Sequence, residues 1–363
     1  MVSQPNRSAA KRVAILVENQ FEDSEFQVPY NALKQAGVKV VVLGSRMNDE
    51  YVGQREQVTI RPDATPTEVR SEDFDAIIIP GGGAPDYVRM NPHAVRLVMN
   101  AIAQEKVVAA VCHGPQVLIE ADQLRGRQAT GYRSIRKDMQ NAGATYIDEP
   151  VIVDGNLITA RQPGDLPLFT TMLLTALRLD LSGKAMPDPS DQHYSWWQLA
   201  ADWGGSSRQD ILNALNAAIV GERYTLAAFE KYAEKVSGVE LQVILQEVIT
   251  TKRQHVNLLE QRLAAFDEQV TWQAMGSEAF ATLQGWLQSS DEMAITRRAL
   301  GDIQTGVVDA LHLASQLTDP TTVQVLSQIE ANLARHEQRF SDFYRARAGA
   351  QVEPPTPTTL AVS

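Results

Sequence analysis

Two patterns of apolar and polar residues divide the chain near its middle. In the first half, short apolar runs alternate with longer stretches in which apolar residues recur every three or four positions. The apolar runs cover residues 12–17, 38–43, 75–80 and 107–111, and the longer stretches cover 22–35, 91–104 and 114–121. Buried strands alternating with amphipathic helices are typical of a parallel sheet with helices on both faces. We therefore expect an α/β sandwich here.

The second half has helical spacing almost throughout. Four long stretches carry it, at about 207–236, 239–265, 291–317 and 320–348. Ser207 with Asp210, and Ser289 with Glu292, are typical of capped helix starts. The intervening residues 267–289 are long enough to cross between the second and third helices and to hold a short helix. These features predict an all-α four-helix bundle with one long connection.

The composition changes near residue 185, which indicates a domain boundary. All five tryptophans follow this point, and the formal charge is −2 up to it and −9 after it. Prolines and a Gly-Gly pair interrupt the next stretch, which is typical of a linker. Its adjacent tryptophans, Trp196 and Trp197, predict that it packs against another part of the protein. The expected organisation is a flexible N-terminus (1–10), the α/β domain (11–181), a linker (182–206), the bundle (207–348) and a disordered tail (349–363).

Charge and composition exclude several classes of function. A net charge of −11 argues against nucleic acid as a partner, because the phosphate backbone is also negative. The chain lacks the run of about 18 apolar residues that a membrane helix needs, and its first residues lack the apolar core of a signal peptide. A single cysteine, Cys112, excludes an intramolecular disulfide and favours a reducing, cytoplasmic setting.

That cysteine follows a predicted strand and precedes a predicted helix, in the segment AAVCHGPQ. A strand–turn–helix setting is typical of a nucleophile elbow, where the helix N-terminus stabilises a thiolate. Gly114 allows a tight turn and leaves room near the sulfur, and His113 is placed to act as acid, base or imidazolium partner. The alternative interpretation is that Cys112 is an ordinary small core residue.

Two further segments end at the same edge of the predicted sheet. PGGGAPD, residues 80–86, supplies backbone N–H groups that can approach a developing oxyanion, and we assign that role to Gly82 and Gly83 together with the His113 N–H. ENQFEDSEF, residues 18–26, places Glu22, Asp23 and Glu25 at this edge, where they either approach the sulfur or complement a helix dipole.

Five stretches resemble the ThiJ/PfpI family of the class I glutamine amidotransferase-like superfamily, and most closely its PfpI-type branch. They are FEDSE, PGGGAPDYVR, AAVCHGPQVL, LRGRQATGY and VIVDGNLITARQPGDL, within about residues 11–180. The resemblance implies a flavodoxin-like α/β sandwich in which Cys112 is the nucleophile, His113 the catalytic histidine and Glu25 the carboxylic acid that touches the sulfur. It also implies that an acidic third member, here Asp86, comes from a neighbouring subunit, so that the protein is a homodimer or larger. The branch most often has the longer Glu there.

The resemblance further implies a cysteine-dependent enzyme or stress-protection protein. Its substrate would be a small molecule or peptide of carbonyl type: a peptide bond, methylglyoxal or a glycated group. The alternative is a redox-responsive binding or oligomerisation protein whose Cys112 is oxidised under stress. Because no second cysteine can resolve it, oxidation would stop at sulfenic or sulfinic acid or require an external thiol.

In the second half, polar residues interrupt the apolar seams of the predicted helices. They are Glu222, His255, Asp302, Asp309 and His336. Acidic groups on the first and third helices, with histidines on the second and fourth, resemble the di-iron bundles of the ferritin-like superfamily.

Two departures from that pattern argue against a metal. A di-iron bundle needs Glu three residues before each histidine, but Lys252 and Leu333 stand at those positions. We therefore expect a ferritin-like accessory domain without cofactor, used for assembly or partner binding. In it, His255 and His336 are core residues hydrogen-bonded to Glu222 and to Asp302 or Asp309. A di-metal oxidase is the remaining alternative.

Overall fold

A computed structural model describes residues 11–180, 186–191, 194–269 and 291–347. The expected flexible N-terminus and disordered tail, and nearly all of the long connection with its short helix, lie outside these ranges. The described residues form two compact units. One consists of the residues up to 211 with 315–320, and the other of 212–314 with the residues from 321.

The first unit contains a six-stranded sheet in the order β2-β1-β5-β6-β10-β9. The four predicted strands are confirmed as β1 (Arg12–Leu16), β2 (Lys39–Leu43), β5 (Ala76–Ile79) and β6 (Val107–Val111). They pair in parallel with one another, and β10 (Leu157–Ala160) pairs in parallel with β6. The sheet differs from the expected parallel sheet at one edge. There β9 (Val151–Asp154) is followed by a turn at Gly155 and pairs antiparallel with β10.

Smaller elements complete this unit. Two short pairs of strands lie outside the main sheet: β3 (Tyr51–Val52) with β4 (Thr59–Ile60), and β7 (Gln128–Ala129) with β8 (Thr145–Tyr146). Single 3₁₀ turns span Ser71–Asp73, Arg133–Ile135 and Pro163–Asp165.

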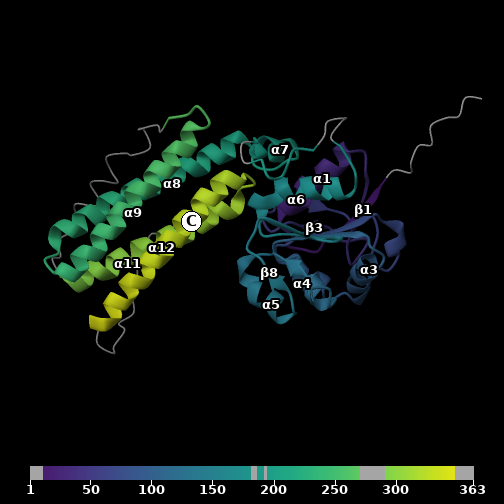
Figure 1. Cartoon of the computed structure of the whole chain (residues 1–363), viewed down its shortest axis with the longest axis horizontal. Coiled ribbons are helices and arrows are strands. Elements are labelled where there is room, and N and C mark those ends of the chain that lie inside the picture. The colour runs from purple at the N-terminus through teal and green to yellow at the C-terminus, as the bar shows by residue number, and fades with distance from the viewer. Residues whose placement is uncertain (1–10, 181–185, 192–193, 270–290, 348–363) are drawn as a thin grey trace, which may run out of the picture. The chain divides into compact units, whose positions relative to one another are not determined.

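Helices cover both faces of the sheet, as the sequence predicts (Figure 1). One face carries α1 (Asp23–Gln35), α6 (Leu166–Ala176) and α7 (Trp196–Asp202). The other carries α3 (Pro92–Ala103), α4 (Pro115–Glu120) and α5 (Arg136–Asn141), and the five-residue α2 (Ala84–Val88) follows β5. Alternate residues of β1 enter the two cores, since Ile15 packs on the α1 side and Leu16 on the α3 side.

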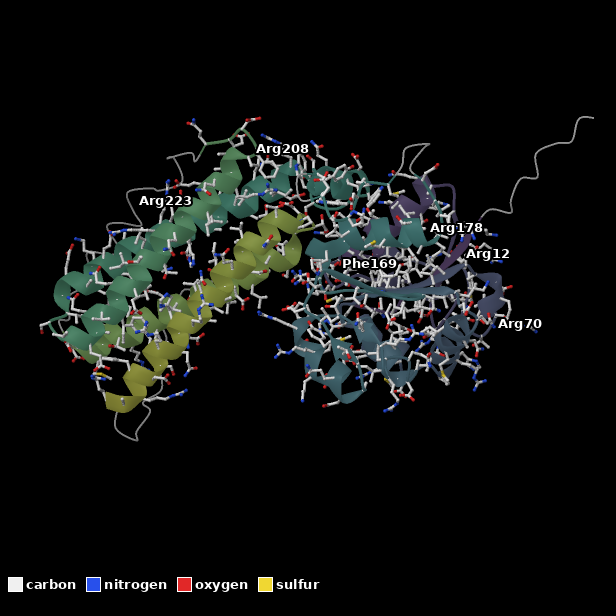
Figure 2. All side chains as sticks on the ribbon, in the orientation of Figure 1. Arg12, Arg70, Phe169, Arg178, Arg208 and Arg223 are labelled. Atoms are coloured by element: carbon white, nitrogen blue, oxygen red, sulfur yellow. The ribbon has the colours of Figure 1, made fainter. Side chains whose placement is uncertain are left out.

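Helix α7 lies within the segment expected to be a linker. Its Trp196 and the following Trp203 are almost completely buried in the same core as Phe169 of α6. Figure 2 shows Phe169 among the densely packed side chains of this unit, with Arg70 at its periphery. The side chain of Asn31 donates to the carbonyl of Trp203 over 2.9 Å, which ties the end of α7 to α1.

The second unit is built from four long helices, as the apolar periodicity predicts. They are α8 (Arg208–Lys235), α9 (Val239–Ala264), α11 (Glu292–Gln316) and α12 (Pro320–Arg347). Their buried seams meet in a core in which Phe229 of α8 and Phe340 of α12 contact edge to face, with ring centroids 6.1 Å apart. Within the described ranges, none of the helices combines the length and apolar character needed to cross a membrane.

Candidate active site

Cys112 lies directly after β6, where the chain turns into α4. It is 6% exposed and has a positive φ of 58°, which is uncommon for a residue with a side chain and costs about 1–3 kcal/mol. Two hydrogen bonds hold it there. Its N–H donates to the Ala160 carbonyl over 3.0 Å, and its carbonyl accepts from the Tyr132 N–H over 2.8 Å. The structure thus contains the strained turn that the resemblance implies.

Gly114 is needed because the backbone of β5 lies close to it, and not only to leave room near the sulfur as expected. Its φ of −49° is ordinary, but a Cβ at this position would lie 2.3 Å from the Ile79 carbonyl oxygen and 2.9 Å from that of Val111. Any side chain here would therefore collide with the backbone of β5. The glycine lets the turn after Cys112 fit tightly against the end of the neighbouring strand.

His113 contacts the sulfur directly. Its Nδ1 lies 3.2 Å from Sγ of Cys112, and its Nε2 lies 3.0 Å from the hydroxyl oxygen of Ser134. The ring also packs on Tyr132, with centroids 5.0 Å apart. Burial lowers the pKa of His113 below its usual 6.5, and the charge of Asp86 opposes this only in part. The imidazole is therefore neutral at pH 7 and available to accept the thiol proton.

Glu25, on the first turn of α1, is completely buried beside the cysteine. Its Oε2 accepts a hydrogen bond from the Gly81 N–H over 2.7 Å, and a Cβ on Gly81 would lie 2.8 Å from both that oxygen and Cβ of Cys112. Burial, and next the charge of Glu22, raise the pKa of Glu25 well above its usual range. Of Glu22, Asp23 and Glu25, Glu25 is the one that the structure brings to the sulfur.

The thiol is held in its neutral form by the same surroundings. Burial raises the pKa of Cys112 above its usual 9.0, and the charges of Glu25 and Glu22 raise it further. A hydrogen bond from the Gly82 N–H opposes this rise. Because the imidazole pKa is lowered and the thiol pKa is raised, the resting pair is a thiol beside a neutral histidine.

The glycine segment follows β5 and approaches the site closely. Gly82 has a φ of 73°, and a Cβ there would lie 2.3 Å from the Gln20 carbonyl oxygen. The Gly83 N–H donates to that same carbonyl over 2.7 Å, so it is already engaged away from the sulfur. Of the two glycines assigned to an oxyanion hole, Gly82 is the better placed.

Asp86 lies on α2 with its side chain 60% exposed, and its carboxylate forms an ion pair with Arg89 over 2.7 Å. Both ring nitrogens of His113 are engaged by Cys112 and Ser134 of the same chain. Within one chain, Asp86 therefore acts on His113 through its charge.

Two features of the site are not predicted from the sequence. Ser134 follows His113 by 21 residues, in the 3₁₀ turn Arg133–Ile135, and no motif marks it. Arg55, in the loop between β3 and β4, forms an ion pair with Glu22 and donates to Ser24 over 2.9 Å. This pair neutralises Glu22, which caps α1 by accepting from the Glu25 N–H over 2.8 Å, and so holds the helix start that carries Glu25.

In the helical unit, Glu222 and His255 come together as expected. Nδ1 of His255 donates to Oε2 of Glu222 over 2.9 Å, and Nζ of Lys252 donates to Oε1 over 3.1 Å. Burial disfavours the ionised form of Glu222. The hydrogen bond from His255 and the charge of the Lys252 ammonium outweigh this effect and lower the pKa of Glu222. Thus His255 is a hydrogen-bonded core histidine.

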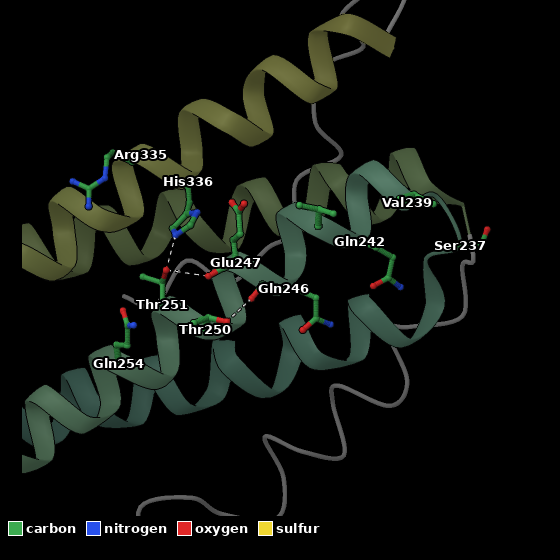
Figure 3. Close-up of a pocket in the computed structure, with 11 residues that line it drawn as sticks. Ser237, Val239, Gln242, Gln246, Glu247, Thr250, Thr251, Gln254, Arg335 and His336 are labelled. Carbon is green, nitrogen blue, oxygen red and sulfur yellow. Dashed lines mark hydrogen bonds between the residues drawn. The ribbon is translucent and has the colours of Figure 1, made fainter.

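The expected partner of His336 is wrong. Its Nε2 donates to the Thr251 hydroxyl over 2.9 Å, at a groove of about 770 Å³ between α9 and α12 (Figure 3). Asp302 instead accepts from the Tyr232 hydroxyl over 2.7 Å. The spacing along each helix places these residues in the bundle but does not determine which side chains meet across it.

Glu222, Asp302 and Asp309 line one cavity of about 350 Å³ between α8, α11 and α12. The described residues contain no group of three or more His, Cys, Asp or Glu side chains arranged to hold a metal ion.

Comparison with known proteins agrees with this architecture. Residues 11–176 match the DJ-1/PfpI family. The chain is 43% identical over 155 residues to a protein of Pyrococcus abyssi named as a deglycase, covering 43% of this chain and 92% of that relative. It is 41% identical over 168 residues to general stress protein 18 of Bacillus subtilis, covering 46% of this chain and 98% of that relative.

A solved structure from Anabaena variabilis matches both units. It is described as a two-domain protein with DJ-1/ThiJ/PfpI-like and ferritin-like domains. The match has 51% sequence identity and a TM-score of 0.91, and it covers 96% of this chain and 99% of that one. The sandwich is thus the flavodoxin-like fold of these proteins and the bundle is ferritin-like. Since the curated relatives match over nearly their full lengths, the chain belongs to the DJ-1/PfpI family.

Proposed function

We propose that this protein is an enzyme that uses Cys112 as a nucleophile on a carbonyl-type substrate. The observation that carries this proposal is the contact of 3.2 Å between the cysteine sulfur and Nδ1 of His113, at a turn where Cys112 has a φ of 58°. A cysteine that only fills space in the core would need neither the positive φ of Cys112 nor its contact with His113. A relative named as a deglycase supports a glycated substrate, and a relative of similar identity named as a putative cysteine protease supports a peptide.

The chemical step begins from the neutral pair. Sγ adds to the carbonyl carbon while Nδ1 of His113 accepts the thiol proton, and the carbonyl oxygen takes the electron pair of the broken π bond. N–H groups of Gly82 and His113 stabilise the resulting oxyanion. Return of the proton from His113 to that oxygen gives a neutral thiohemiacetal. Glu25 keeps a proton close to the sulfur and so limits the charge buried there.

A second copy of the chain completes the proposed site. Asp86 has an exposed side chain on α2, as a contact between subunits requires. We place it near His113 of the neighbouring subunit in a homodimer or larger assembly, and we place the protein in the cytoplasm, because a single reactive thiol suits a reducing compartment.

Methylglyoxal consumption by the full-length protein tests the enzymatic proposal. A proton shift from C1 to C2 of the bound thiohemiacetal gives a lactoyl thioester, and water then cleaves its C–S bond to release lactate and the Cys112 thiol. Wild type should therefore consume methylglyoxal with formation of lactate, and Cys112→Ala should lose at least about 10³-fold in kcat/KM. His93→Gln, on the exposed side of α3, is the matched control and should retain wild-type turnover. Turnover that survives in Cys112→Ala would overturn the proposal.

One observation favours the redox alternative. Oε1 of Glu25 is buried with no oxygen or nitrogen partner among the described residues, so it could donate to an oxygen added to the sulfur. One relative is named as a general stress protein. Mild peroxide should then add two oxygens to Cys112, detectable by mass spectrometry, and loss of this product in Glu25→Ala would support the role. If the sulfur of Cys112 stays reduced under mild peroxide, the redox alternative is excluded.

A further inference from the structure

The polar centre of the bundle departs from a di-metal site at two of the positions that would supply a ligand. Di-metal bundles of this fold use a Glu from each of two helices and a Glu-x-x-His pair from each of the other two. Here α8 supplies Glu222 and α11 supplies Asp302, but α9 supplies Lys252 and His255, and α12 supplies Leu333 and His336. The fit of this centre to metal ions therefore depends on Lys252, His255, Leu333 and His336.

Lys252 occupies the position that a cation would need. Its side chain is completely buried, and its Nζ lies 3.1 Å from Oε1 of Glu222 and 5.8 Å from the centre of the Phe229 ring. A buried ammonium is tolerated only where a carboxylate balances it. Because that ammonium already contacts the carboxylate, a divalent ion at the same oxygen would meet both repulsion and a lost ion pair.

His255 has no lone pair left for a metal. Its Nδ1 donates to Glu222 over 2.9 Å, and its Nε2 accepts from Nδ2 of Asn332 over 3.0 Å. The amide of Asn332 is fixed in this orientation because its oxygen accepts from Arg335. The remaining nitrogen of His255 is thus committed to a hydrogen bond inside the bundle.

The fourth helix has no carboxylate at the position that would pair with His336. Leu333 is completely buried and lies close to α11, since a Cβ on Gly306 would be 2.9 Å from its Cδ1. The ring of His336 instead lies at the groove between α9 and α12, where it contacts Thr251 (Figure 3). These side chains do not fit a metal pair.

We infer that the ammonium of Lys252 takes the place of a metal ion in this ferritin-like bundle and balances the negative charge of Glu222. The centre of the bundle is neutralised by the chain itself, and the domain neither needs nor takes up a divalent ion there. The inference concerns the second unit alone and does not depend on the chemistry of Cys112.

A double-mutant cycle in the full-length protein tests the charge pair. Lys252→Met and Glu222→Gln should each lower the thermal midpoint of the helical unit, followed by circular dichroism, by about 10 °C, because each leaves one buried charge unbalanced. The double variant should recover at least about half of that loss. Arg253→Met, the next residue along α9, removes an exposed ion pair with Glu230 and should shift the midpoint by less than about 2 °C. Strictly additive losses in the double variant would overturn the inference.

Metal uptake provides the second test. The full-length protein with Cys112→Ser, which removes the thiol as a ligand, is titrated with Zn²⁺ and with Mn²⁺ by calorimetry. We expect no stoichiometric uptake by the bundle and no rise in its thermal midpoint. Stoichiometric binding that is lost on adding Glu222→Gln would show that the ion displaces Lys252, and would overturn the inference.

Discussion

The hydroxyl oxygen of Ser134 lies 3.0 Å from Nε2 of His113, on the side of the ring opposite the cysteine. A base that takes the Cys112 proton at Nδ1 must carry its own proton on Nε2, and the Ser134 hydroxyl can accept the hydrogen bond from that N–H. Ser134 is therefore a positioning residue that acts through His113.

We expect Ser134→Ala to lower kcat/KM about tenfold, the cost of losing one hydrogen bond that orients the ring. The loss should fall mainly on kcat, and Ser134→Thr should restore most of the activity because it keeps the hydroxyl. Equal kinetic constants for wild type and Ser134→Ala would show that the packing of Tyr132 alone orients the ring.

The pH profile of kcat/KM distinguishes a neutral pair from a thiolate–imidazolium pair. Burial lowers the pKa of His113 below 6.5, so the base becomes protonated, and activity falls, only at lower pH. Burial and the neighbouring carboxylates raise the pKa of Cys112 above 9.0, so the thiol stays neutral up to that range. We therefore expect a plateau between these pH values and a decline below 6.5. A rate that rises steadily from pH 7 to 9 would instead indicate attack by a pre-formed thiolate.

Glu25→Gln should lower the pKa of Cys112, since the amide keeps a donor of similar shape beside the sulfur but cannot ionise as the pH rises, as the carboxyl can. The pH dependence of alkylation by iodoacetamide reports this pKa without interference, because Cys112 is the only cysteine. Glu22→Gln should lower it less, as Glu22 raises the thiol pKa less than Glu25 does. An unchanged or higher pKa in Glu25→Gln would mean that the carboxyl mainly stabilises the thiolate.

Mixed subunits test whether Asp86 acts between copies. When the Ser134 hydroxyl accepts from Nε2 of His113, it can donate its own hydrogen to a carboxylate, so Asp86 of a second copy can act on His113 through this hydroxyl. A heterodimer of Cys112→Ala and Asp86→Ala chains would then contain one intact site. We expect about half of the wild-type activity in purified heterodimers carrying two tags, and little in either parent. Activity no higher than the mean of the parents would place Asp86 within its own subunit or outside the mechanism.

The fold is predictable from the sequence where the buried face of an element produces a regular pattern of apolar residues. Strands such as β5 are wholly apolar because both faces are covered, and the four long helices keep one buried seam each. β9 gives a weaker signal because it is an edge strand on which Val153 is 47% exposed. α6 has no polar face to mark it, because Leu166, Phe169 and Leu173 are all buried.

The site is predictable to the extent that its residues are neighbours in sequence. Cys112, His113 and Gly114 share one turn, and the resemblance adds Glu25. Ser134 comes from a 3₁₀ turn and Arg55 from a loop, and the positions of both depend on the whole fold, so no local pattern indicates them. Lys252 is visible in the sequence as a departure from a metal-binding pattern, but its contact with Glu222 becomes evident only in the packed bundle.

Two glycines of α11 give opposite predictions for stability. A Cβ on Gly301 meets nothing within 4 Å, whereas one on Gly306 would lie 2.9 Å from Cδ1 of Leu333. Gly301→Ala should therefore raise the free energy of unfolding of the helical unit by about 0.5–1 kcal/mol, because alanine reduces the entropy of the unfolded chain and favours the helix. Gly306→Ala gains the same propensity but forces Leu333 to move, at a cost of about 1–3 kcal/mol. Urea unfolding followed by circular dichroism measures both, and a Gly306→Ala variant as stable as Gly301→Ala would show that α11 and α12 are less tightly packed at Leu333 than the structure indicates.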